Sequence, residues 1–346
     1  MINYIDKLRI SATLMVFSLH SLLFTGKNFP MQDILRDSGG YFIFFTPAWG
    51  AVWIFFVMSG YLAGNSWNLG KYKLCRDSIA KYYWKKIRRV YIPTIFYIIC
   101  FCVVMEKPEI IGDHHVIWGI LTSTFDGQSI LPAGTGATWY IFTLMWLYFT
   151  VPLLKILYSK VDKKIIICTA ALCGLSIRLI WWHFGYDWQQ MYISSCINMD
   201  LFICGFGVNY FDKVHVKLRY KALVLVLFLT LILSNAYMWA FWWNMDIYRY
   251  ICETLYLILT CLYLYTFRWQ VVQRKSDISF VEKFMKKFSK ISFEFYLFHS
   301  LIFYQIAGHI GGHSAIGQWV KFILIGGSIT VIFAIGWNKI FQTQQS

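Results

Sequence analysis

The stretch Leu8–Phe24, LRISATLMVFSLHSLLF, is apolar along its length, but it carries an arginine at one end and a histidine near the other. A run of about 17 to 25 such residues is typical of a membrane-spanning helix. Ten residues separate Arg9 from His20, so a helix places them about 16 Å apart along its axis. Leaving an ionisable side chain in hydrocarbon costs roughly 2–3 kcal/mol or more, which makes both residues candidates for function. The alternatives are a headgroup anchor for Arg9 and a packing residue for His20.

The composition indicates that lipid surrounds most of the chain. Of the 346 residues, 58% are hydrophobic and 14% charged, whereas soluble domains have roughly 25% charged residues. The net charge of +15 could suggest a nucleic-acid partner, but the basic residues lie in short loops between apolar runs. This pattern indicates membrane topology, and we expect no nucleic acid to bind. The nine cysteines lack the spacing of a zinc site, so we expect no metal.

Ten apolar runs of about membrane-spanning length follow one another along the chain. They cover residues 8–24, 41–64, 90–105, 138–158, 165–184, 192–210, 222–243, 248–267, 291–308 and 319–341. We therefore predict an all-α, polytopic integral membrane bundle of about ten transmembrane helices. No linker or repeat divides the chain, so residues 1–346 are expected to form a single domain.

The loops predict the orientation of this bundle. Residues 65–89 carry eight Lys or Arg, and 268–290 carry seven. These basic loops alternate with loops that contain few basic residues, such as 106–137, in which Lys107 is the one Lys or Arg. Because basic loops stay on the cytoplasmic side, both termini are expected to be cytoplasmic.

Several charged residues lie inside the predicted spans. Arg178, Asp200 and Glu253 are at depths where they could pair with one another, as buried charges require. Glu294 lies near the inner end of the ninth predicted span, close in sequence to Lys290, and could orient Arg9 or another cation there. A second interpretation is a proton relay in a transporter, which would use Glu294, Asp200 and His299.

A basic cluster leads directly into the third predicted span and contains Lys85, Lys86, Arg88 and Arg89. Such a cluster can be a solvated product of the positive-inside rule. It can also be a cradle for a phosphorylated molecule from the cytoplasm, because guanidinium groups bind phosphate well. No P-loop or G-x-G-x-x-G motif competes for this role.

Five segments, in order, resemble the transmembrane acyltransferases of acyltransferase family 3. The segment YIDKLRISATLMVFSLH (4–20) is similar to the family's Asp-x-x-Arg opening, with ten residues between an Arg and a His. FFVMSGYL (55–62) resembles its Phe-Phe-x-x-Ser-Gly signature, and KKIRRVYIP (85–93) its Arg-x-x-Arg motif before a proline. TWYIFTLMWL (138–147) and ISFEFYLFHSLI (291–302) resemble two later segments, the second of which places His299. Lys86 departs from the pattern, because it keeps the charge but loses the bidentate fork.

The resemblance implies an O-acyltransferase that moves an acyl group, usually acetyl, from cytoplasmic acetyl-CoA to a hydroxyl of a glycan or lipid-linked sugar. It implies a bacterial inner-membrane protein, here without the fused extracytoplasmic domain of some relatives. The candidate catalytic residues are His20, His299 and Glu294, and Ser59 and Tyr61 are candidates to stabilise an oxyanion. The candidate donor-binding residues are Arg9, Lys86, Arg88 and Arg89. The acceptor, the acyl length, an acyl-histidine intermediate and the oligomeric state stay open.

Overall fold

The computed structural model describes residues 4–25, 48–104, 112–122, 138–212, 214–241, 246–268, 280–311 and 314–342. All elements in these ranges are helical, as predicted. The long helices are α1 (Tyr4–Thr25), α3 (Ala48–Asn68), α10 (Lys163–His183), α13 (Leu218–Phe241), α14 (Asp246–Phe267) and α15 (Phe280–Ala307). The shorter ones are α4 (Arg76–Lys86), α5 (Ile92–Val104), α6 (His114–Thr122), α8 (Thr138–Phe149), α9 (Val151–Lys160), α11 (Trp188–Ile193), α12 (Met199–Gly207), α16 (Ala315–Lys321) and α17 (Gly327–Gln342). Two π-helical turns, η2 (Ile87–Tyr91) and η5 (Phe322–Gly326), join α4 to α5 and α16 to α17, and the 3-10 turn η4 (Val208–Tyr210) follows α12.

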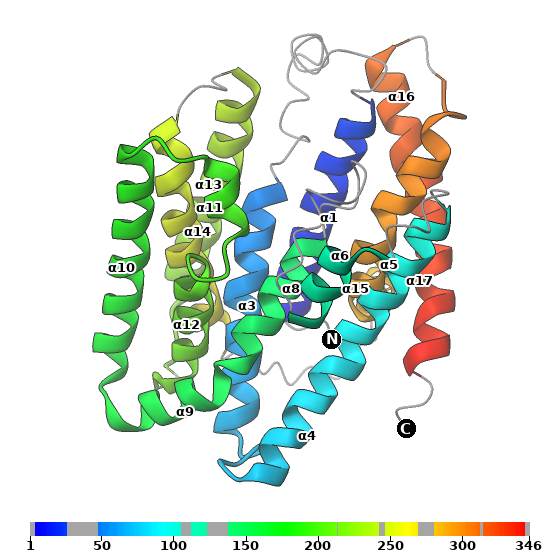
Figure 1. Cartoon of the computed structure of the whole chain (residues 1–346). Coiled ribbons are helices and arrows are strands. Elements are labelled where there is room, and N and C mark those ends of the chain that lie inside the picture. The colour runs from blue at the N-terminus through cyan, green and yellow to red at the C-terminus, as the bar shows by residue number, and fades with distance from the viewer. Residues whose placement is uncertain are drawn as a thin grey trace.

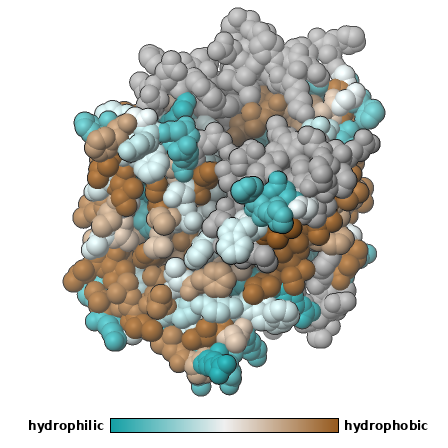
Figure 2. All heavy atoms as spheres, in the orientation of Figure 1, coloured by the Kyte–Doolittle hydropathy of each residue, from teal (hydrophilic) through white to brown (hydrophobic). Residues whose placement is uncertain are grey.

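Six helical stretches of the described chain are long and apolar enough to cross a membrane, or seven if the bent pair of α8 and α9 counts as one span. Helices α3 and α15 are not among the six, although they contain 21 and 28 residues. The exposed side chains of α10 include Ile165, Leu172 and Ile180. Figure 2 shows the corresponding apolar flank, with hydrophilic side chains above and below it. The multi-span character of the chain is therefore confirmed, whereas ten spans and cytoplasmic termini stay predictions.

Helices α1 and α3 lie at the centre of the bundle, between a group formed by α10–α14 and a group formed by α15–α17 (Figure 1). Helix α1 packs on both α3 and α15, and α15 packs in turn on α17. Because α3 is enclosed by other helices, sixteen of its residues are buried, including Trp53, Phe56 and Trp67. The apolar core therefore runs along α3 and holds the two groups together.

Glycines allow α3 and α12 to approach at backbone distance. A Cβ atom on Gly60 would lie 2.1 Å from the carbonyl oxygen of Phe202, and one on Gly205 would lie 2.0 Å from that of Val57. Real Cβ atoms do not come this close to backbone, so the contact requires glycine on both helices. The pair Gly60 and Gly64, with three residues between them, is the small-residue pattern that permits such packing in membranes.

The charges predicted to pair inside the spans form one buried network. A single terminal nitrogen of Arg178, Nη2, lies 2.7 Å from Asp200 Oδ1 and 2.6 Å from Glu253 Oε1. Nη1 of the same guanidinium also donates to Thr254 Oγ1 at 3.3 Å. The network joins α10, α12 and α14, and the side chains of Arg178 and Glu253 are fully buried. A guanidinium and two carboxylates that would each be costly in lipid thus stabilise one another.

The predicted span 192–210 is not one helix, because the chain turns between α11 and α12. The side-chain amide of the buried Asn198 donates to the carbonyls of Tyr192 and Ser194, at 2.8 and 2.7 Å. These bonds satisfy backbone groups that the end of α11 leaves without helical partners. The break lets α12 begin at the depth where Asp200 meets Arg178.

We expect Gly174→Ala to destabilise the fold through this network. A Cβ atom at Gly174 would lie 2.0 Å from Asp200 Oδ2, so the carboxylate must move away from Arg178. Overpacking of this kind costs about 1–3 kcal/mol, and the midpoint of thermal unfolding in detergent should fall by several degrees. The matched control is Gly336→Ala on α17, where a Cβ meets nothing within 4 Å. The control should leave the midpoint unchanged or raise it, and an equal loss in both variants would contradict the prediction.

Candidate active site

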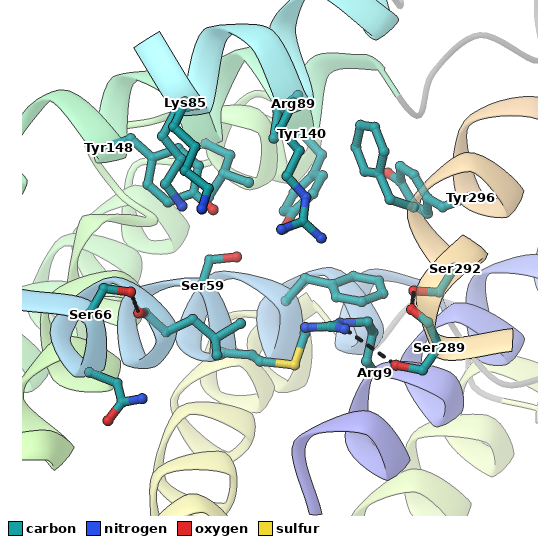
Figure 3. A pocket seen from close by; sticks show the side chains of 18 of the residues that line it. Arg9, Ser59, Ser66, Lys85, Arg89, Tyr140, Tyr148, Ser289, Ser292 and Tyr296 are labelled. Atoms are coloured by element: carbon teal, nitrogen blue, oxygen red, sulfur yellow. Dashed lines mark hydrogen bonds between the residues drawn. The ribbon is translucent and has the colours of Figure 1, made fainter. Parts of the chain in front are cut away.

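A cavity of about 380 Å³ lies between α1, α3, the α4–η2 segment, α8 and α15. Small-molecule sites are typically clefts of about 300–1,000 Å³, so its size fits part of a ligand or a small one. Figure 3 shows Arg9, Ser59, Arg89, Tyr140 and Tyr296 projecting into this space from different helices. Segments far apart in the sequence therefore build one site.

The cavity is strongly cationic. Among the described residues that line it, six carry a positive charge and one, Glu294, carries a negative charge. The six are Arg9, Lys71, Lys85, Lys86, Arg89 and Lys290. Lys71, Lys85, Arg89 and Lys290 are exposed, so they form a basic rim that solvent can reach. A site of this charge favours an anionic ligand, and several phosphate groups on one molecule would suit it best.

An aromatic ring holds the lysine that stands in place of the family's arginine. The Lys86 Nζ lies 3.7 Å from the centre of the Tyr148 ring and 5.5 Å from that of Tyr82. A cation over an aromatic face at this distance is attracted to it. The two rings therefore orient a side chain that is otherwise flexible.

A wide helical turn carries Arg89. In η2 the N–H of Ile92 donates to the carbonyl of Ile87, five residues earlier. Pro93 has no N–H with which to continue the ordinary helical pattern, and such interruptions are typical causes of π turns and kinks. Lys86, the last residue of α4, and Arg89 on this turn line the cavity, but Arg88, which is exposed, is not among the lining residues. The structure therefore separates Arg88 from the other predicted donor-binding residues.

The Asp-x-x-Arg motif ties α1 to α15 at the basic end of the cavity. The Arg9 guanidinium lies 3.6 Å from Asp6 Oδ1 and donates to Ser289 Oγ at 3.3 Å. The Ser289 hydroxyl in turn donates to Asp6 Oδ1 at 2.5 Å. Arg9 is thus held with part of its surface exposed toward the cavity. Glu294 also lines the cavity and accepts a hydrogen bond from Asn338 Nδ2 at 3.3 Å.

The two predicted catalytic histidines contact each other. His20 Nδ1 lies 2.7 Å from His299 Nε2 and 3.1 Å from Ser300 Oγ. His299 Nδ1 lies 2.6 Å from the carbonyl oxygen of Tyr296. A carbonyl can only accept, so His299 Nδ1 carries a proton, and the neutral ring then accepts at Nε2. His20 therefore donates from Nδ1, which leaves the lone pair of its Nε2 as the basic atom.

Helices α1 and α15 run in parallel and in register between the cations and the histidines. Arg9 bonds to Ser289, and eleven residues later on both helices His20 bonds to Ser300. At about 100° per residue, Arg9 and His20 face the same side of α1, about 16 Å apart along its axis. Thr13, between them, lines the cavity as well. One face of α1 thus leads from the basic rim to the histidine pair.

The structure brings most of the predicted site residues into two adjoining groups. Arg9, Lys86, Arg89 and Glu294 line the cavity, and His20 and His299 form the pair beyond it. Of the two candidate oxyanion donors, Ser59 lines the cavity. The Tyr61 hydroxyl instead lies 2.6 Å from that of Tyr4. In the described part of the chain, no group of three or more His, Cys, Asp or Glu side chains could hold a metal ion.

Sequence reasoning missed several polar residues of the site. Lys71, Asn65 and Ser66 line the cavity from α3 and the turn after it, and Ser289 and Ser292 line it from α15. The spacing of serines along α15, at 289, 292 and 300, was a signal, because these positions lie on one face of a helix. Serines at this spacing in an apolar helix indicate a polar seam between helices.

Residues 2–337 match the family model described as Acyltransferase domain. The match covers nearly the whole chain, so the protein belongs to acyltransferase family 3, as the resemblance of the five segments predicted. No curated protein and no solved structure matches the chain. Family membership and the apolar helices together support a multi-pass membrane acyltransferase.

Arg88 and Arg89 are neighbouring exposed arginines and give a matched test of the cavity. If the cavity binds the phosphates of coenzyme A, as the resemblance implies, Arg89→Ala should weaken that binding, measured by titration calorimetry, because a phosphate would lose a charge-assisted hydrogen bond. Such a bond is worth about 1.5–3 kcal/mol, which corresponds to a rise in Kd of about tenfold or more. Arg88→Ala should leave the Kd within about twofold, since its side chain does not line the cavity. An equal loss in both variants would indicate a diffuse surface charge instead of a site.

Proposed function

We propose that the protein is a membrane O-acyltransferase that moves an acetyl group from cytoplasmic acetyl-CoA to a hydroxyl of a cell-surface glycan or lipid-linked sugar. The observation that carries this proposal is the common face of α1, on which Arg9 lies at a cationic cavity and His20 contacts His299. One end of this face suits phosphate groups and the other suits proton transfer. The family match supports acyl transfer as the reaction class.

The cationic cavity is the proposed site of the donor. Arg9, Lys86 and Arg89 would hold the phosphate groups of coenzyme A, and Lys71 and Lys85 add charge at the exposed rim. The distance of about 16 Å from Arg9 to His20 is comparable to the length of a phosphopantetheine arm. The thioester would therefore reach the histidines while the phosphates stay at the rim. Glu294 lies on the cavity wall, about 7.5 Å before His299 along the axis of α15, and would orient the cations around the donor.

His20 is the proposed general base. Its Nε2 would accept the proton of the acceptor hydroxyl as the hydroxyl oxygen attacks the thioester carbonyl. The carbon–sulfur bond then breaks, and the proton passes from His20 to the departing thiolate. Ester and free coenzyme A are formed, and no net proton is consumed. A covalent acyl-histidine, in which Nε2 itself attacks the carbonyl, uses the same residues in two steps.

His299 is the proposed positioning residue for His20. Its Nδ1 is fixed by the Tyr296 carbonyl, so its Nε2 is always available to accept from His20. The ring of His20 is then held in the tautomer whose Nε2 is basic, and the developing charge on His20 is shared with a neighbour. The phenyl rings of Phe17 and Phe303 flank His299, with centres 6.1 and 5.9 Å from its own, and help to bury that ring.

The proposed acceptor and the proposed location in the cell membrane rest on the family resemblance and not on the cavity. Relatives that modify surface glycans work in the bacterial inner membrane, and we propose the same location here. The alternative function is a secondary transporter with an intramembrane proton relay. Asp200, one member of that relay, is instead paired with Arg178. Proton-coupled uptake into liposomes without an acyl donor would support the alternative.

His20→Ala should lower acetyl transfer by about 10²–10⁴-fold, the usual contribution of a general base. The measurement is transfer of labelled acetyl from acetyl-CoA to the cell-surface glycan fraction, in membranes that contain equal amounts of folded protein. His183→Ala removes an exposed histidine at the end of α10 and is the matched control, with unchanged transfer expected. If the His20→Ala variant still modified the glycan fully, His20 could not be the general base.

The role of His299 is tested by two replacements of similar size. Glutamine can donate to the Tyr296 carbonyl and accept from His20, whereas leucine can do neither. We therefore expect His299→Leu to lower kcat by about 100-fold or more, and His299→Gln to restore a substantial part of it. The KM for acetyl-CoA should change little in both, because the donor phosphates bind elsewhere. If both variants lost the same activity, His299 would be a packing residue and not the partner of His20.

A further inference from the structure

Three aromatic rings from three helices meet in a triangle at one end of the cavity. They belong to Phe55 on α3, Tyr140 on α8 and Tyr296 on α15. The ring centres are 5.9 Å apart for Phe55–Tyr140, 5.9 Å for Phe55–Tyr296 and 5.8 Å for Tyr140–Tyr296. Rings at these separations are in contact, so no room for a ligand is left between them.

The triangle lies at the end of the cavity nearest the histidines. On α15, Tyr296 is the last residue that lines the cavity before His299. On α8 the lining runs from Tyr148, which holds Lys86 at the basic end, back to Tyr140. On α3, Phe55 is the first lining residue and Ser66 the last. In Figure 3, Tyr296 lies on the side of the cavity away from Ser66 and Tyr148.

The triangle also contacts the histidine pair directly. The Tyr296 ring centre is 5.9 Å from that of His299, and the carbonyl of the same tyrosine accepts the His299 Nδ1 proton. All three aromatic residues are buried, with 8%, 6% and 5% of the surface of Phe55, Tyr140 and Tyr296 exposed. The rings therefore lie between the cationic cavity and the buried imidazole of His299, whereas His20 is partly exposed. Neither histidine lines that cavity.

We propose that Phe55, Tyr140 and Tyr296 form an aromatic gate that the acyl end of the donor must displace to reach His20, and that this gate selects short acyl groups. The proposal rests on the function proposed above. In this proposal, a thioester held by its phosphates at the rim reaches the histidines by moving at least one ring. The aperture made by rotating one ring admits an acetyl group, whereas a longer chain must displace more than one.

The closed gate has a second consequence, because it keeps cavity water from the histidine pair. If water reached a bound thioester beside His20, its oxygen would attack the carbonyl carbon and the carbon–sulfur bond would break. Acetate and coenzyme A would form, with one proton released, and the acyl group would be lost. A gate that opens only around the donor prevents this hydrolysis in the absence of an acceptor.

The test compares acyl donors of different length with Phe55→Ala, which removes one ring from the triangle. We measure transfer from acetyl-CoA and hexanoyl-CoA, together with the hydrolysis of acetyl-CoA without acceptor. One extra methylene group of a substrate in an apolar pocket changes the preference between two substrates by about 10–200-fold. We therefore expect the ratio of hexanoyl to acetyl transfer to rise about tenfold or more, and hydrolysis to increase.

Leu62→Ala is the matched control, because it also removes apolar volume from the cavity wall on α3, about 10 Å nearer the basic end. The ratio of hexanoyl to acetyl transfer should stay as in the wild type. Phe55→Leu, which is a smaller change, covers the case in which Phe55→Ala does not fold, and it should shift the ratio in the same direction. Tyr140→Phe keeps the ring and should keep the wild-type ratio.

The outcomes separate the gate from the function on which it rests. Acetyl transfer with an unchanged ratio and unchanged hydrolysis in Phe55→Ala and Phe55→Leu would overturn the gate and leave the acyltransferase intact. An equal shift in Leu62→Ala would also overturn it, since any enlargement of the cavity would then suffice. If the wild-type protein neither transferred nor hydrolysed any acyl-CoA, the proposed function itself would fail.

Discussion

The parallel register of α1 and α15 is the constraint on which the site depends. It is fixed twice, by Arg9 with Ser289 and by His20 with Ser300, at positions eleven residues apart on each helix. A shift of one residue between the helices would rotate both pairs out of contact by about 100°. Arg9 and His20 both lie on α1, so the helix itself sets their separation, and the contacts with Ser289 and Ser300 on α15 hold both side chains in place. This separation, and not either residue alone, makes the face suitable for a long donor.

The Arg178 network also fixes how helices pack, but its three charged residues do not line the cationic cavity. Its three ionic groups lie on three helices and are almost completely enclosed. Breaking such a pair leaves an uncompensated charge, which costs about 3–5 kcal/mol. The network therefore specifies how α10, α12 and α14 pack, and α3 transmits this arrangement to α1 through the close glycine contact with α12. The charges at the cavity differ because solvent and ligand can reach them.

Much of this could be predicted from the sequence, because a bilayer restricts what apolar runs and buried charges can do. The helical class, the pairing of Arg178, and the close approach at Gly60 follow from local pattern and from the cost of burying charge. The sequence did not predict the break between α11 and α12, since it depends on where the amide of Asn198 finds carbonyls in three dimensions. The sequence also predicted the same donor-binding role for Arg88 and Arg89, but only Arg89 lines the cavity. Their separation depends on the wide turn before Pro93, which one-dimensional spacing does not show.

The two parts of the proposed site differ in their access to water: the cations lie at a rim that solvent reaches, and His299 is buried beside His20. In the proposed reaction, the donor phosphates bind solvated cations, whereas the general base beside the thioester works best away from water. The chain places Lys85 and Arg89 at an exposed rim and the imidazole of His299 between phenyl rings. In the proposed gate, Phe55, Tyr140 and Tyr296 lie between the two regions, and their movement would control how the donor passes from one to the other. Because the Tyr296 carbonyl also fixes His299, a movement of this tyrosine's backbone would alter the base and the barrier together, whereas rotation of its ring alone would open the barrier and leave the base in place.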